Sequence, residues 1–108
     1  MDKKAVLDVI SRFREAIESK GIKVSKLILF GSCATGSNRE GSDIDIVVIS
    51  NDFADKSYWE RIGILSDAIY EVFEPIEAVA MTSAEWRKKS SLIAEYARNG
   101  KVVYTGKI

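Results

Sequence analysis

The chain has 108 residues, of which 46% are hydrophobic and 30% are charged. This length is that of one ordinary domain, and the composition is typical of a globular protein with its own core. We therefore expect a single domain over residues 1–108. Sixteen basic and sixteen acidic residues cancel, so the chain lacks the positive excess with which proteins hold an extended nucleic acid.

Histidine is absent, and Cys33 is the only cysteine. These absences exclude an internal disulfide, a Ser-His-Asp triad and zinc sites that contain histidine, so proton transfer and metal binding must fall to carboxylates. No apolar run approaches the roughly 20 residues that cross a bilayer, and the chain does not open with a signal-peptide pattern. We expect a cytoplasmic protein that makes no membrane contact.

The first half of the chain alternates predicted regular structure with one long loop. Apolar residues recur at helical spacing from Ala5 to Lys20, which predicts an amphipathic helix that ends at Gly21. Val24 to Phe30 is predicted to be a strand whose apolar end is covered on both faces. Residues 31–42 contain three glycines and several small polar residues, a composition typical of a loop. A second strand, rich in β-branched residues, is predicted from Asp43 to Ile49.

The second half predicts two more helices and two more strands. One helix begins near Tyr58 and is terminated by Pro75, since proline cannot continue it. Ile76 to Met81 follows as a strand, and a capping-box pattern at Thr82 opens a helix to about Arg98. Residues 102–104 add a short last strand. This order predicts an α/β fold, α+β in detail, in which helices pack on a small mixed sheet of three to four strands.

Asp43 and Asp45 are the first candidates for chemistry. Side chains alternate along a strand, so both carboxylates project from one face, with their Cβ atoms roughly 6.5 to 7 Å apart. Two carboxylates at the start of an apolar strand are costly unless they are solvated, paired or bound to cations. Mg²⁺ prefers oxygen ligands, and two such ions stabilise both the attacking and the leaving oxygen of a phosphoryl-type transfer. The pair therefore predicts a divalent metal site.

Gly31 and Ser32 are the second candidates, because they follow the end of a strand. Glycine lets backbone N–H groups approach an anion closely, and the serine hydroxyl is a further donor. The two residues therefore predict a phosphate-binding turn. A Gly-Ser pair alone is usually only a turn, and it is the acid pair downstream that favours phosphate binding.

The motif that joins these residues resembles the signature of the DNA polymerase beta-like nucleotidyltransferases, and most closely that of the minimal nucleotidyltransferases. It consists of Phe30-Gly31-Ser32, Gly36 and Ser42-Asp43-Ile44-Asp45-Ile46-Val47-Val48. The resemblance spans about residues 24–81. It implies the fold of that superfamily and the transfer of a nucleoside monophosphate to an acceptor hydroxyl. The expected nucleotide is AMP, taken from ATP. Pyrophosphate would be released, and two Mg²⁺ ions would serve as cofactors.

The resemblance also implies roles for single residues. Gly31 and Ser32 would bind the triphosphate, while Asp43 and Asp45 would hold the metal ions. Members of the family have a third carboxylate on a following strand, where this chain has Glu77, so Glu77 is assigned as a metal ligand and general base. The alternative is that Glu77 is a solvated edge residue or a salt-bridge partner.

A cation for the triphosphate is the remaining assignment. Many minimal members carry arginines shortly after the Gly-Ser pair, whereas residues 33–35 here are Cys, Ala and Thr. Arg39 and Lys26 are the candidate replacements, and of the two Arg39 lies in the expected loop. Arg39 is alternatively a free loop cation.

The acceptor is expected on another molecule, because one small domain leaves no room for an acceptor-binding domain. By resemblance, the partner would be a small helical protein of the HEPN type, with this chain as the antitoxin of a toxin–antitoxin pair; a homo-oligomer is the other assembly considered. Two further hypotheses stay open: a module that binds NTP and Mg²⁺ without catalysis, and an interaction protein without nucleotide chemistry.

Overall fold

The computed structural model describes residues 3–31, 43–88 and 100–106. The elements in these ranges follow in the order α1 (Lys3–Glu18), β1 (Lys26–Phe30), β2 (Ile44–Ile49), the 3-10 helix η1 (Asn51–Phe53), α3 (Tyr58–Val72), β3 (Ile76–Met81), α4 (Ser83–Arg87) and β4 (Lys101–Thr105). None of these helices is long and apolar enough to cross a membrane. The mixture of helices and strands confirms the predicted fold class.

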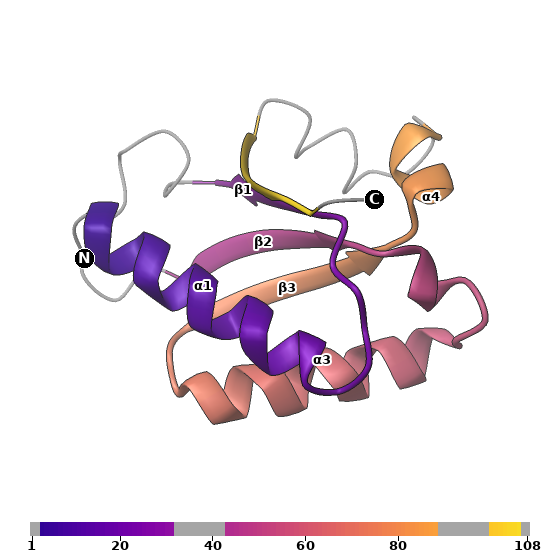
Figure 1. Ribbon diagram of the computed structural model, residues 1–108, viewed down its shortest axis with the longest axis horizontal. Helices are drawn as coiled ribbons and strands as arrows, with labels where there is room; N and C mark the ends of the chain where they lie inside the picture. Colours follow the sequence, from indigo (N-terminus) through magenta and orange to yellow (C-terminus); the bar gives the residue numbers. More distant parts are fainter. Residues whose placement is uncertain (1–2, 32–42, 89–99, 107–108) are drawn as a thin grey trace.

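The four strands form one mixed sheet in the order β3-β2-β1-β4. β1 is antiparallel to both β2 and β4, whereas β2 and β3 are parallel. A parallel pair needs a crossover connection, and α3 supplies it. Figure 1 shows α1 lying across the sheet and α3 running beside β3, with β4 on the far side of β1. Among the described strands, β3 and β4 are therefore at the two edges.

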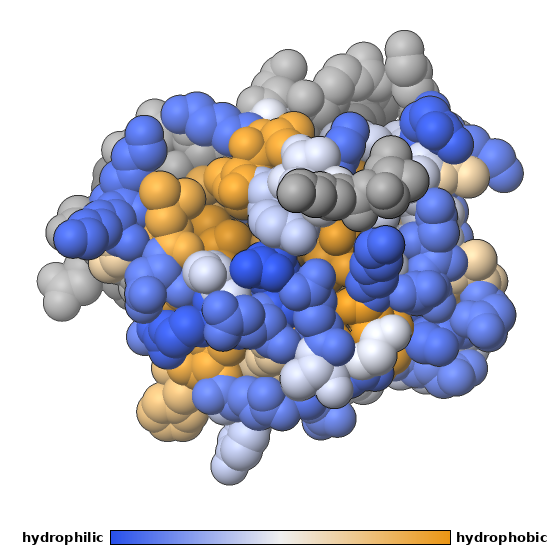
Figure 2. Space-filling view, in the orientation of Figure 1, coloured by the Kyte–Doolittle hydropathy of each residue, from blue (hydrophilic) through white to orange (hydrophobic). Residues whose placement is uncertain are grey.

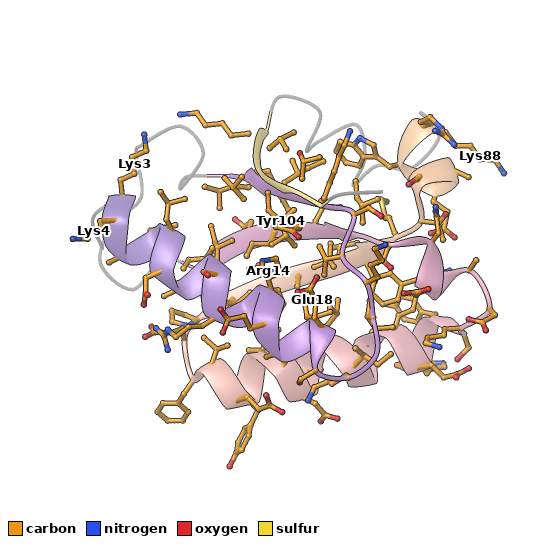
Figure 3. All side chains as sticks on the ribbon, in the orientation of Figure 1. Lys3, Lys4, Arg14, Glu18, Lys88 and Tyr104 are labelled. Atoms are coloured by element: carbon orange, nitrogen blue, oxygen red, sulfur yellow. The ribbon has the colours of Figure 1, made fainter. Side chains whose placement is uncertain are left out.

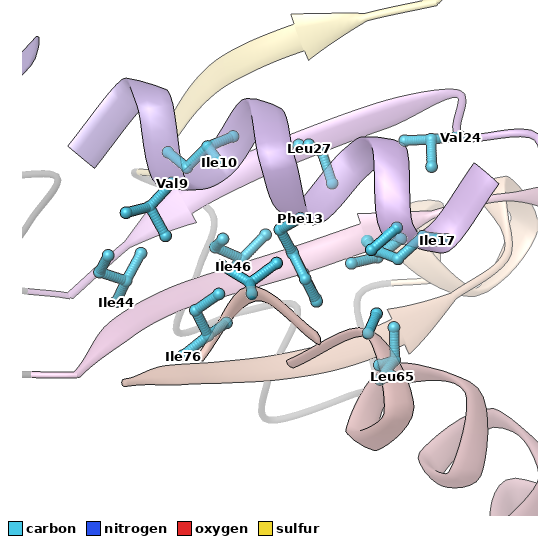
Figure 4. Packing of buried hydrophobic residues seen from close by; sticks show 14 of the residues in the cluster. Val9, Ile10, Phe13, Ile17, Val24, Leu27, Ile44, Ile46, Leu65 and Ile76 are labelled. Atoms are coloured by element: carbon cyan, nitrogen blue, oxygen red, sulfur yellow. The ribbon is translucent and has the colours of Figure 1, made fainter. Parts of the chain in front are cut away.

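The larger part of the core lies between the sheet and the helices α1 and α3. Phe13 and Ile17 of α1 are fully buried there, in one cluster with Ile44 and Ile46 of β2 (Figure 4). Burying a side chain of this size stabilises the fold by roughly 1.5 to 3 kcal/mol. Val47 belongs instead to a second, smaller cluster on the opposite face of the sheet. The predicted alternation of side chains along β2 is thus confirmed.

The second cluster packs residues from three strands on the face that α1 and α3 do not cover. Its buried members are Ile28, Phe30, Val47, Ile49 and Met81, with Val79 and Trp86 packed against them. A sheet with apolar residues on both faces reads as continuous hydrophobic runs, which explains the unbroken apolar sequence at the end of β1.

The helix that opens at Thr82 differs from its prediction. Its capping box is confirmed, because the Thr82 hydroxyl accepts from the Glu85 N–H at 3.1 Å and the Glu85 carboxylate accepts from the Thr82 N–H at 2.9 Å. α4 nevertheless ends at Arg87, and Lys88 has extended backbone angles. The predicted continuous helix to Arg98 is therefore wrong at Lys88; residues 89–99 lie outside the described residues.

The residue that ends α3 also differs from the prediction, which named Pro75. The helix ends at Val72, and Phe73 caps it in the left-handed conformation, with φ of 57° and its N–H bonded to the Ile69 carbonyl at 2.9 Å. Pro75 lies two residues beyond this cap. The stop is therefore made by the backbone of Phe73, a residue type that seldom adopts this conformation, rather than by the proline.

Polar contacts fasten the helices to the sheet. Arg14 of α1 pairs with Glu18 at 2.7 Å and lies over the ring of Tyr104 in β4, 4.5 Å from its centroid (Figure 3). The contact links α1 to an edge strand. Hydrophilic side chains dominate this face of the molecule, with hydrophobic surface showing between them (Figure 2).

Candidate active site

The parallel pairing of β2 and β3 brings two acids together that are far apart in sequence. Asp45 stands opposite Glu77 in the register of the two strands, and the two carboxyl groups are within hydrogen-bonding reach. Both side chains lie on the face opposite α1 and α3, because Ile44, Ile46 and Ile76 belong to the helix-facing core and side chains alternate along each strand. The strand register thus forms an acid pair at the start of β2 and β3.

Asp43 joins this pair from the residue before β2. It is two residues from Asp45, on the same face, and it is exposed to solvent. The negative charge of Asp43 raises the pKa of Asp45, because it disfavours a second negative charge nearby. The three acids named from the sequence therefore lie at one end of the sheet, although Glu77 is more than 30 residues from the other two.

The electrostatics of the group mark it as a place of excess negative charge. Partial burial, then the hydrogen bond and the charge of Glu77, and then the charge of Asp43 raise the pKa of Asp45 from 3.8 to about 6. Like charges that cannot all ionise freely are stabilised by a bound cation. The oxygen-only donor set suits Mg²⁺.

The three acids do not form one closed metal cage. In the part of the chain that the structure describes, no group of three Asp, Glu or Cys side chains converges on a single point that could hold an ion. Asp45 and Glu77 form the close pair, and Asp43 lies further along the same face. The assignment of Asp43, Asp45 and Glu77 as metal ligands stays a prediction, and ligands from the substrate phosphates would have to complete any site.

Gly31 approaches the acid pair from the end of β1. It follows β1, whose last residue, Phe30, pairs with Asp45, and it has a φ of 71°. A Cβ atom built on Gly31 would run into the carboxylate of Asp45, coming within 3.3 Å of its Cγ as well as clashing with Oδ2. Both the left-handed backbone and the close approach therefore require glycine here. The structure adds a contact with Asp45 to the phosphate-binding role predicted for Gly31.

The two remaining predicted residues of the loop cannot be placed. Ser32 and Arg39 lie outside the described residues, so their roles stay predictions. Lys26, the other cation considered, stands at the far end of β1 and pairs with Ile49 rather than Asp45. Phe30 lies four positions further along the strand, a distance of about 13 Å. This position excludes Lys26 from the acid group.

Two clefts formed by described residues lie away from the acids on the sheet surface. One, of about 480 Å³, includes Lys23, Lys26, Trp86 and Arg87 at the opposite end of β2. The other, of about 570 Å³, lies between α3 and the edge strand β3. Nothing in the sequence pattern pointed to the second cleft; the signal that was available is the pair of alanines, Ala78 and Ala80, in a strand where bulky residues are usual.

Known proteins resemble this chain in sequence family and in fold. The sequence profile of the family described as "Nucleotidyltransferase domain" matches residues 10–98. None of the curated proteins matches the chain in sequence. Among solved structures, a protein from Sulfolobus solfataricus assigned as a nucleotidyltransferase is 17% identical with a TM-score of 0.71, and the match covers 94% of this chain and 81% of that one.

A second solved structure is a toxin–antitoxin with AMP-PNP. It is 20% identical to this chain with a TM-score of 0.64, and the match covers 94% of this chain and 74% of that one. At these identities, both likenesses concern the fold. Because the family profile covers most of the sequence, from α1 through the acids of β2 and β3, the chain belongs to the nucleotidyltransferase domain family.

Proposed function

We propose that the chain is a Mg²⁺-dependent nucleotidyltransferase that moves AMP from ATP to a hydroxyl group on a partner protein. The observation that carries this proposal is the pairing of Asp45 with Glu77 across β2 and β3, with Gly31 packed against Asp45. An acid group beside a glycine turn suits a triphosphate and its metal ions. Family membership supports the transfer of a nucleotidyl group.

Each residue then has a distinct part in the reaction. Asp43 and Asp45 would hold two Mg²⁺ ions, which supply charge stabilisation for the phosphates when they are bound. Gly31 and Ser32 would bind the triphosphate through backbone N–H groups and the serine hydroxyl, with Arg39 as the nearby cation. Glu77, exposed and beside Asp45, would accept the proton of the acceptor hydroxyl. The hydroxyl oxygen forms a bond to the α-phosphorus, and pyrophosphate leaves with the electrons of the broken P–O bond.

The proposed acceptor belongs to a second protein. The toxin–antitoxin among the similar structures binds a nucleotide analogue, which favours a protein partner and ATP for this chain. A small helical HEPN-type toxin is the partner class that the minimal nucleotidyltransferases suggest. A cytoplasmic setting fits such a pair.

The test uses the purified chain with α-labelled ATP and Mg²⁺, with and without the protein encoded beside it. Label on the partner that depends on Asp45, lost in Asp45→Asn, is the expected result. Binding of Mg²⁺ and ATP without label transfer to the true partner would instead favour the non-catalytic module. Absence of any thermal stabilisation by Mg²⁺ and ATP would favour an interaction protein, because a ligand that binds only the folded state must stabilise it.

A further inference from the structure

The outer edge of β3 offers main-chain hydrogen-bonding groups. Within the described residues, β3 pairs only with β2. Ile44 N–H donates to the Pro75 carbonyl at 2.8 Å and Ser50 N–H donates to the Met81 carbonyl at 2.9 Å. In a parallel ladder the bonding residues alternate, so the odd-numbered residues of β3 face β2. The N–H and C=O groups of Ile76, Ala78 and Ala80 therefore point toward the open edge.

A cleft of about 570 Å³ lies along this edge, between β3 and α3. Tyr58 and Ile62 of α3 form one wall, and Ala78 and Ala80 of β3 form the other. The two alanines are half-buried, and their methyl groups leave room beside the strand for larger side chains. The cleft thus has an apolar stretch between α3 and β3, with Lys56, Arg61 and Glu85 also in its lining, and a row of main-chain groups at its rim.

The cleft is fixed in shape at its far end by an ion pair. Arg61 of α3 donates to both carboxylate oxygens of Glu85, at 2.7 and 3.2 Å. Such two-point contacts are geometrically specific, and this one joins α3 to α4 across the cleft. The opposite end of the cleft leads along β3 toward Glu77.

In the residues that the structure describes, the edge of β3 has few of the features that usually protect an exposed strand. Natural edges carry proline or lysine, or are very short. The six residues of β3 include neither, and Glu77 is its only charged residue. An unprotected apolar edge is suited to pairing with an additional strand, a known way of binding peptides.

We propose that the edge of β3 and the adjoining cleft bind an extended polypeptide segment as an additional strand and present one of its Ser, Thr or Tyr hydroxyls to Glu77. This inference rests on the proposed function, because it assigns the acceptor of that reaction. N–H and C=O groups that point away from β2 at strand spacing are matched by an extended backbone, which a helix or a small alcohol does not supply. The occupant is therefore a segment of a protein partner.

Strand geometry connects this edge to the acids. Successive side chains of a bound strand would point alternately into the cleft and to the face of Glu77. The residue opposite Glu77 would have its Cβ atom about 4.5 to 5.5 Å from that of Glu77, which places a hydroxyl within reach of the carboxylate. The proton of the acceptor hydroxyl passes to Glu77, and the hydroxyl oxygen forms a bond to the α-phosphorus of ATP. The bond from that phosphorus to pyrophosphate breaks, and pyrophosphate departs. Acceptor, base, metal-binding acids and glycine turn would then lie in a row from outside β3 to β1.

The test uses two variants of the edge and a control on the other edge. Ala80→Pro removes an N–H that points away from β2, a position where a strand tolerates proline. Ala78→Lys leaves the backbone intact and fills the cleft, so it remains informative if the proline variant does not fold. Val102→Lys is the matched control, since Val102 is exposed on the edge strand β4.

The probe is a library of synthetic peptides of about ten residues with random sequence around a fixed Ser, Thr or Tyr. Mg²⁺, ATP and each variant are added, and AMP transfer is read by mass spectrometry. We expect the unchanged chain and Val102→Lys to modify the same peptides, and both β3 variants to lose roughly tenfold or more of this activity. Stabilisation by Mg²⁺ and ATP should be the same in all four proteins.

Other outcomes separate the inference from the function on which it rests. Equal labelling by the unchanged chain and both β3 variants would overturn strand docking while leaving the transferase intact, as would modification of partner proteins but of no peptide. If the chain self-associates and Ala80→Pro abolishes this, the edge of β3 binds a second copy of the chain. That outcome would also overturn the acceptor assignment. If Mg²⁺ and ATP do not stabilise the unchanged chain and nothing is labelled, the proposed function itself fails.

Discussion

Asp45 of β2 and Glu77 of β3 stand opposite each other in a parallel register, with their carboxyl groups within hydrogen-bonding reach. The pair lies at the end of the sheet where β1 also stops, so Gly31 contacts Asp45 directly. An acid pair in this setting has consequences for stability, for metal binding and for catalysis, and each can be measured.

The first prediction concerns stability and pH. The pKa of Asp45 is raised from 3.8 to about 6 in the folded chain, so between these values the folded state holds a proton that the unfolded state has released. The stability that protonated Asp45 contributes is complete below about pH 4 and is lost as the pH rises through 6. Relative to Asp45→Asn, the metal-free chain should therefore lose stability between pH 4 and pH 7, measured by urea unfolding at each pH.

The control for this measurement is Asp67→Asn, which removes a carboxylate from an exposed position on α3. It should follow the unchanged chain at every pH. Mg²⁺ at neutral pH should raise the melting temperature of the unchanged chain and of the control, but not that of Asp45→Asn. A pH profile of Asp45→Asn identical to that of the unchanged chain would contradict the coupling of these acids.

The second prediction compares two glycines in left-handed conformations. Gly31→Ala and Gly21→Ala both introduce backbone strain of about 1 to 3 kcal/mol, since their φ values are 71° and 88°. A Cβ at Gly21 meets nothing within 4 Å, whereas one at Gly31 clashes with Asp45. Gly31→Ala should therefore be the more destabilising and should also weaken Mg²⁺ binding, which Gly21→Ala should leave unchanged. Calorimetric melting and metal titration of the two variants would decide the point.

A third glycine has the opposite expectation. Gly63 lies within α3, and a Cβ there meets nothing within 4 Å. Because glycine is disfavoured inside a helix, Gly63→Ala should stabilise the chain by about 0.5 to 1 kcal/mol. Chemical denaturation measures this difference, and a loss of stability would argue that another molecule or another part of the chain packs at this position.

Ser50 provides a prediction about buried polar contacts. It is fully buried, its hydroxyl donates to the Lys23 carbonyl at 2.6 Å, and the same oxygen accepts from the Asp52 N–H at 3.1 Å. Ser50→Ala removes both hydrogen bonds and should cost about 1 to 3 kcal/mol. Ser66→Ala, at an exposed position of α3, is the control and should change stability by less than about 0.5 kcal/mol. Equal effects in urea unfolding would contradict the role assigned to Ser50.

The last prediction concerns Glu77 as a base. If Glu77 accepts the acceptor proton, Glu77→Gln should lower the rate of AMP transfer by about 10² to 10⁴-fold, the usual contribution of such a group. Glu77→Asp keeps a carboxylate and should retain much more of the rate. Both variants should fold normally because the side chain is exposed. Equal rates for the two variants in single-turnover transfer assays would remove Glu77 from this role.

Much of the fold was predictable because it depends on local pattern. The alternation that directs Ile44 and Ile46 to the helices and Asp45 to the other face follows from strand geometry alone, and the capping box at Thr82 follows from two residues three apart. Element ends were less predictable. Phe73 closes α3 although its residue type rarely adopts a left-handed backbone, and Lys88 leaves the helix within a sequence that continues a helical pattern.

By itself, the sequence determined the residue types of the site. These are the Gly-Ser turn after a strand, two aspartates spaced two residues apart, and one acid on the next apolar strand. Tertiary structure decided how they meet. The crossover through α3 brings β3 alongside β2 in parallel register, which places Glu77 opposite Asp45, and the antiparallel return of β1 brings Gly31 against the same carboxylate. Such long-range pairings depend on how the helices and strands pack together, and no local pattern in the chain encodes them.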